Sequence, residues 1–111
     1  MIHPLSGIEV LGIDVAPDTR CAHYHSERDI IAIRFKCCDR YYPCHACHDA
    51  IAGHAARQWS KAEFEQLAVL CGACGVELSI RQYMNCESTC PDCGAGFNPN
   101  CALHYELYFE I

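Results

Sequence analysis

The chain has 111 residues, enough for one domain or two very small ones, and this length excludes a large enzyme fold. Hydrophobic residues make up 51% of it, but eleven of them are cysteines, so the remaining apolar core is modest and metal or covalent cross-links are expected to supply stability. A net charge of −6 argues against a nucleic-acid partner, because binding to a phosphate backbone depends on clustered Lys and Arg.

The N-terminal residues favour a cytoplasmic protein. Residues 1–20 contain no basic stretch followed by an apolar run, and no segment of the chain approaches the roughly 18 apolar residues of a membrane-spanning helix. We therefore expect no membrane association and a reducing compartment, in which a dense cysteine pattern favours metal binding over disulfides. The odd number of cysteines, eleven, points the same way, because disulfides could not pair every thiol.

Two segments in the first third of the chain are predicted to be strands. Residues 8–15 (IEVLGIDV) are apolar and rich in β-branched side chains, which predicts a short strand that ends before Pro17. Residues 29–36 (DIIAIRFK) are rich in β-branched and aromatic side chains and predict a second strand, with an apolar face opposite a face that carries Arg34 and Lys36. The residues expected on the apolar face are Ile31, Ile33 and Phe35.

Short helices are expected next. Asp49 can cap a helix that runs towards Trp59, although Gly53 weakens it. Ser60 and Glu63 form a capping-box pattern, which predicts another short helix through about residue 67. Further strands are predicted at residues 76–80 and, at the end of the chain, around Leu103, Tyr105, Leu107 and Phe109.

Residues 44–48 (CHACH) match the C-x-x-C-H pattern of covalent haem attachment. Cys44 and Cys47 would equally suit a zinc site or a thioredoxin-like redox pair. Covalent haem attachment normally follows export, and residues 1–20 carry no visible export signal. We therefore expect zinc and no haem.

The second half of the chain carries the clearer metal pattern. The spacing C-x2-C-x15-C-x2-C, in which two hooks supply the corners of a zinc tetrahedron, is formed by Cys71, Cys74, Cys90 and Cys93. Gly75 and Gly94 follow the second cysteine of each hook, where a positive φ lets backbone N–H groups turn towards the sulfurs.

The first half is denser and offers enough ligands for two tetrahedral zinc sites. They are Cys21, His23, Cys37, Cys38, Cys44, Cys47, His48 and His54. We expect His48 to lie before the helix and His54 on it, because their separation would place them far apart around a helix axis. Spacing does not decide which four share an ion. One option is a cross-braced arrangement, with one site of Cys21, His23, Cys44 and Cys47 and a second site of Cys37, Cys38, His48 and His54.

Together these motifs resemble the CHY-type zinc finger over residues 21–93. The resemblance is carried by Cys21-Ala-His23-Tyr24, the Cys37-Cys38 pair, Tyr42-x-Cys44-x2-Cys47-His48, His54 and the two later hooks. It implies a three-zinc module that uses the twelve ligands named above. Members of the family occur in RING-and-CHY ubiquitin ligases, where the module contributes to binding protein partners, and in a mitochondrial intermembrane-space helper of small Tim proteins. The chain shows no RING motif, so ubiquitin transfer is not implied, and it is more similar to stand-alone bacterial CHY-finger proteins.

The expected fold is a small metal-stapled α+β structure. Short strands and one or two short helices would surround three zinc sites, with a C-terminal part like a zinc ribbon. Residues 1–20 would form an N-terminal strand or extension, and residues 94–111 a C-terminal strand that packs on the finger. Within the finger, residues 21–54 would hold two zinc ions and residues 71–93 the four-cysteine site.

Three potential ligands are not needed by this scheme. Cys86, Cys101 and His104 could hold a fourth zinc ion, but three groups make an open site unless another ligand joins them. The simpler interpretation is that both thiols act as small buried hydrophobes, because free cysteine is commonly buried. His25 and His45 are also surplus and are expected outside the zinc sites.

The ligand count predicts a non-enzymatic domain. A zinc ion with four protein ligands has no position at which to activate water, so the sequence predicts a structural zinc-binding domain that presents a surface to an unidentified protein partner. The alternative is a thiol redox or zinc-handling protein in which Cys44 and Cys47, or Cys86 and Cys101, exchange electrons or metal. Access to the thiols separates the two hypotheses.

Overall fold

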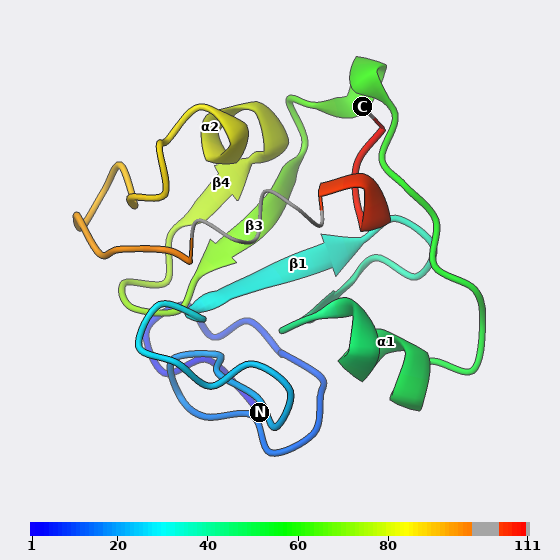
Figure 1. The fold of residues 1–111 in the computed structure, drawn as a ribbon, viewed down its shortest axis with the longest axis horizontal. Coiled ribbons are helices and arrows are strands. Elements are labelled where there is room, and N and C mark those ends of the chain that lie inside the picture. Colours follow the sequence, from blue (N-terminus) through cyan, green and yellow to red (C-terminus); the bar gives the residue numbers. More distant parts are fainter. Residues whose placement is uncertain (99–104, 111) are drawn as a thin grey trace.

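The computed structural model describes residues 1–98 and 105–110, and within them the strands form one antiparallel sheet of four, in the order β2–β1–β3–β4 (Figure 1). The strands are β1 (Ile31–Phe35), β2 (Arg40–Tyr42), β3 (Leu67–Cys71) and β4 (Glu77–Ser79). The helices are α1 (His45–Ile51) and α2 (Ile80–Met84), and 3-10 turns are formed by Lys61–Glu63 and by residues 105–107. The expected small α+β fold is confirmed, and no helix among the described residues is long and apolar enough to cross a lipid bilayer.

Strand β1 has the buried face predicted for it. Ile31, Ile33 and Phe35 are buried in the main core, which also receives side chains from β3, α1 and α2. Ala32 lies on the opposite face of the sheet, where it packs with Val10 of the N-terminal segment in a second, smaller core. Both faces of the central strands are therefore covered.

The N-terminal segment is not the strand predicted for residues 8–15. It pairs only through isolated bridges, of which one joins Val10 to Tyr41 of β2. The chain turns sharply after Leu11, where Asp14 has a φ of 53°. Gly12 lies so close to Pro43 that a Cβ at this position would be 2.9 Å from the proline ring. This turn brings the N–H of Ile13 within 3.5 Å of the Cys47 Sγ.

Helix α1 begins earlier than predicted. Cys44, not Asp49, is the N-cap, and its Sγ accepts a hydrogen bond of 3.3 Å from the N–H of Cys47. The expectation that His48 would precede the helix was therefore wrong, because the C-x2-C hook itself forms the first helical turn. The helix ends before Gly53, whose φ of 71° is of the kind that terminates helices.

Strand β3 was not predicted, and the helix expected from Ser60 is only one 3-10 turn. The capping box is present, with both the N–H and the hydroxyl of Ser60 donating to the Glu63 carboxylate, but the chain then extends into β3. Because β3 lies between β1 and β4, its side chains are buried on both faces from Ala68 to Cys71. Its sequence is therefore continuously apolar and lacks the alternation that marks a strand with one exposed face.

The C-terminal residues differ from the strand expected there. Residues 105–107 form a 3-10 turn, in which the Tyr105 carbonyl accepts hydrogen bonds from the N–H groups of Tyr108 and Phe109. A single bridge joins Phe109 to Trp59, and the Phe109 side chain is fully buried. The expected position Leu103 lies outside the described residues.

Candidate metal centres

The twelve predicted ligands lie in three separate groups of four, and within each group all the ligand atoms are within 4.8 Å of one another. The first cluster consists of Cys21, His23, Cys44 and Cys47. The second cluster consists of Cys37, Cys38, His48 and His54. The third cluster consists of Cys71, Cys74, Cys90 and Cys93. The first two groups have the cross-braced arrangement that the sequence allowed as one option.

The first cluster joins the loop before β1 to the start of α1. The His23 Nδ1 lies 3.5 Å from the Cys44 Sγ and 3.4 Å from the Cys47 Sγ, and the Cys21 and Cys44 sulfurs are 3.7 Å apart. The three thiols are buried, whereas His23 is exposed. The cluster thus ties a loop without regular secondary structure to the end of the sheet.

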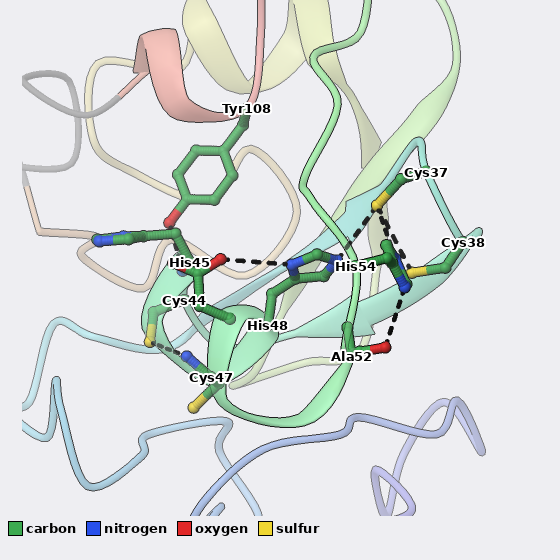
Figure 2. A network of polar contacts seen from close by, with 10 residues as sticks. Cys37, Cys38, Cys44, His45, Cys47, His48, Ala52, His54 and Tyr108 are labelled. Atoms are coloured by element: carbon green, nitrogen blue, oxygen red, sulfur yellow. Dashed lines mark hydrogen bonds and ion pairs between the residues drawn. The ribbon is translucent and has the colours of Figure 1, made fainter.

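The second cluster joins the β1–β2 turn to α1 and the segment after it. Figure 2 shows His48 and His54 directed towards Cys37, and the Nε2 atom of each ring lies 3.2 Å from the Cys37 Sγ. The Cys38 Sγ is 3.9 Å from the Cys37 Sγ. The His54 Nδ1 lies 3.0 Å from the Ala52 carbonyl oxygen, which fixes the ring with Nε2 facing the thiols.

The third cluster closes the β3–β4 turn against the loop after α2. Cys71, the last residue of β3, has its Sγ 3.9 Å from that of Cys93, and the Cys74 and Cys90 sulfurs are 3.8 Å apart. The glycines that follow the two hooks have positive φ angles, as predicted, with 82° at Gly75 and 78° at Gly94. Each glycine N–H donates to the carbonyl oxygen of the first cysteine of its hook, which closes the turn.

The interatomic distances fit zinc. In a tetrahedral site with Zn–S bonds of about 2.3 Å and Zn–N bonds of about 2.0 Å, sulfurs lie about 3.8 Å apart and a sulfur and a nitrogen about 3.5 Å apart. The ligand pairs described above lie 3.2 to 3.9 Å apart, and all the described cysteines are free thiols. Four cysteines, three cysteines with one histidine, and two cysteines with two histidines are the donor sets of structural zinc sites.

Helix α1 contributes to two clusters at once. Cys47 and His48 are adjacent in sequence, yet Cys47 belongs to the first cluster and His48 to the second. Neighbouring residues on a helix point about 100° apart, so one seven-residue helix can direct a ligand to each side. Figure 2 shows this divergence, with Cys44 and Cys47 on one side and His48 on the other. A helix this short depends on such ties for its stability.

Burial keeps several of these thiols protonated when no ion is bound. It raises the pKa of Cys44 and of Cys71 well above the ordinary value of cysteine, although backbone N–H groups that point at both sulfurs oppose the shift. Burial also acts on Cys90, but there the N–H groups of Cys93 and Asp92 outweigh it and lower the pKa. Burial lowers the pKa of His48, which favours the neutral ring that a metal needs.

Zinc binding should therefore release protons. At pH 7 we expect up to about nine protons per three zinc ions, one for each ligand thiol, because zinc binds thiolates. A weakly buffered titration of the metal-free, reduced chain would count them, and the apparent zinc affinity should fall as the pH is lowered. Release of fewer than about six protons would show that the thiolates exist before the metal arrives.

The surplus residues are distributed as follows. The Cys86 Sγ donates to the Tyr83 carbonyl oxygen at 2.9 Å and belongs to none of the three clusters of the described chain. Cys101 and His104, the other members of the suggested fourth site, lie outside the described residues. His25 and His45 are also absent from the clusters.

His3 has a role that sequence reasoning missed. It is buried, and its Nε2 lies 2.8 Å from the Gly72 carbonyl oxygen, within the first hook of the third cluster. Its Nδ1 accepts hydrogen bonds from the N–H groups of Leu5 and Ser6. No local motif marks this contact, because the two partners are 69 residues apart in the sequence.

Comparisons with known proteins agree with this donor chemistry. The model of the CHY zinc finger family matches residues 21–102. Helper of Tim protein 13 of Saccharomyces cerevisiae is 39% identical over 104 residues, which cover 91% of this chain and 90% of that protein. The protein of the same name from Kluyveromyces lactis is 39% identical over 101 residues, which cover 91% of this chain and 88% of that protein. An uncharacterised protein of Schizosaccharomyces pombe is 40% identical over 105 residues, which cover 95% of this chain and 92% of that protein. No solved structure matches the chain.

Proposed function

The chain belongs to the CHY zinc finger family and has about three zinc sites, and on that premise we propose that it is a zinc-stabilised domain that acts by binding another protein. The observation that carries the proposal is that each cluster supplies four ligands from side chains. Zinc held in this way has no open position for a substrate or a reactive water. The ions would then hold the fold, and the domain would have no enzymatic activity.

A Tim protein is the first partner to test. Two relatives are named as helpers of a Tim protein, and the chain aligns with 90% and 88% of their lengths, which supports a similar partner here. The cytoplasmic location expected from the sequence stays a prediction, and cell fractionation would test it.

The test of partner binding uses purified components. Zinc-loaded chain, metal-free chain and a zinc-loaded Cys86→Ser variant would each be titrated with purified Tim proteins of Saccharomyces cerevisiae by calorimetry. We expect a complex with the zinc-loaded chain and with the Cys86→Ser variant, and none with metal-free chain, because the surface depends on zinc for its shape. If the zinc-loaded chain forms no complex, the proposed partner is wrong.

Zinc handling is a second candidate function, and the openness of the second cluster favours it. Cys37 and Cys38 are half-buried and His54 is exposed, whereas Cys44 and Cys47 of the first cluster are buried. A competing chelator or thiol can approach exposed ligands. We therefore expect the metal to exchange faster at the second cluster than at the Cys44–Cys47 pair.

The second cluster should release its zinc first. With a chromogenic chelator in excess, we expect one zinc ion to leave in a fast phase and two in slower phases, because the second cluster has one buried ligand, whereas the third has two and the first has three. A His54→Ala variant should lack the fast phase, and His25→Ala, which changes an exposed histidine outside the clusters, should keep it. Release of all three ions in one phase, or a fast phase that survives His54→Ala, would contradict this order.

A further inference from the structure

A small pocket beside the first cluster is not explained by zinc binding. It has a volume of about 40 Å³ and is lined by Tyr24, Tyr83, Tyr105, Tyr108, Asp29 and Cys44, among others. A buried water needs about 10 to 15 Å³ measured in this way, so the space is of the order of three waters and suits the head of one side chain. Ile31 and Ile33 of β1 also line it.

The pocket has a negative charge at its wall. Burial opposes ionisation of Asp29, but hydrogen bonds from the Asn98 side chain at 2.9 Å and the Ser26 N–H at 3.0 Å outweigh it and lower the pKa of the carboxyl group. No Lys or Arg among the described residues lines the pocket.

The aromatic lining favours a cation that is flat and weakly hydrated. Tyr83 and Tyr105 meet with their ring centroids 5.5 Å apart and an interplanar angle of 60°, so their faces are inclined to each other. A cation within about 6 Å of such a ring is attracted by its π electrons, and a guanidinium group can also stack on the ring. A carboxylate at the edge of the same space provides the hydrogen-bond acceptor that a guanidinium needs.

We propose that this pocket binds the guanidinium group of an arginine side chain presented by a protein partner. The inference rests on the proposed function, since it names the chemistry by which a partner would be recognised. The competing occupant is an uncharged apolar side chain. The tyrosine rings and the β1 residues could pack against it, but Asp29 would not contribute to its binding.

The test uses the zinc-loaded full chain and two short peptides. Acetyl-Gly-Arg-Gly-amide and the same peptide with citrulline, which has nearly the same shape without the charge, would be titrated while amide shifts are followed by NMR. We expect the arginine peptide to shift the signals of residues around the pocket and to bind about tenfold more tightly than the citrulline peptide. Equal affinities would overturn the proposal.

Matched variants locate the effect. Asp29→Asn should weaken binding of the arginine peptide about tenfold, and Glu27→Gln, which removes the same charge from an exposed residue two positions away, should change it less than about twofold. Tyr105→Leu, which keeps an apolar wall but removes one ring, should also weaken it. Each variant would first be checked for three bound zinc ions. An equal effect of Glu27→Gln and Asp29→Asn, or no effect of Tyr105→Leu, would show that only the overall charge matters and would overturn the proposal.

The outcome is separable from that of the proposed function. If the chain binds a Tim protein with the same affinity in the Asp29→Asn variant, the pocket is not the recognition site although protein binding stands. If the arginine peptide binds as expected but no Tim protein does, the pocket inference stands and the proposed partner fails.

Discussion

Replacing Cys71 by serine should remove one zinc ion and unfold at least the half of the sheet that contains β3 and β4. Cys71 is fully buried and ends β3, a strand that pairs on both sides. Structural zinc contributes on the order of 10 kcal/mol, comparable to the whole stability of a domain of this size. Native mass spectrometry would count the ions, and circular dichroism on heating would report the loss of the cooperative transition.

The matched control for this variant is Cys86→Ser. Its half-buried thiol donates one hydrogen bond to the Tyr83 carbonyl, which a serine hydroxyl can replace. We expect three zinc ions and a change in the free energy of unfolding of about 1 kcal/mol or less. Loss of one zinc ion from Cys86→Ser, or retention of three by Cys71→Ser, would contradict the ligand assignment.

Replacing Cys47 by serine should affect two clusters at once. The first cluster loses a ligand, and α1 loses the tie that holds its first turn, so His48 on the same helix is no longer fixed against Cys37. We expect one zinc ion fewer and at least about tenfold faster release from the second cluster, with the third cluster unchanged. Chelator kinetics and native mass spectrometry measure both effects.

Ala50→Ser is the control for this coupling, because it places the same hydroxyl on the exposed face of α1. It should cost about 0.5 kcal/mol of helix propensity and leave all three ions in place. If Cys47→Ser leaves the release rate of the second cluster unchanged, the two clusters are independent and the helix does not couple them.

The sequence was most informative where the ligand spacing is local. The C-x2-C hooks of the third cluster and their glycines could be read directly, since each hook is a turn of a few residues whose shape follows from the spacing. Strand β1 was equally clear, because Ile31 and Phe35 lie on one buried face and Arg34 lies on the other face. Local chemistry dictates both features.

The remaining features depend on contacts between distant residues. Helix α1 was misplaced because its N-cap is a cysteine, whose sulfur here takes the role that an Asp or Ser side chain usually has. Strand β3 was missed because burial on both faces removes the alternating pattern. The grouping of ligands in the first half was left open because it depends on how α1 faces the β1–β2 turn, which no spacing rule fixes.

We infer that three closed four-ligand zinc sites hold this fold, and native mass spectrometry of the reduced, purified chain would check this. The native mass gives the number of bound zinc ions, and the denatured mass shows any disulfides. Three zinc ions with every thiol reduced is the predicted result. Fewer than three ions together with a disulfide would contradict this prediction and would favour redox or zinc-handling chemistry. Four ions would show that the ligand assignment is incomplete.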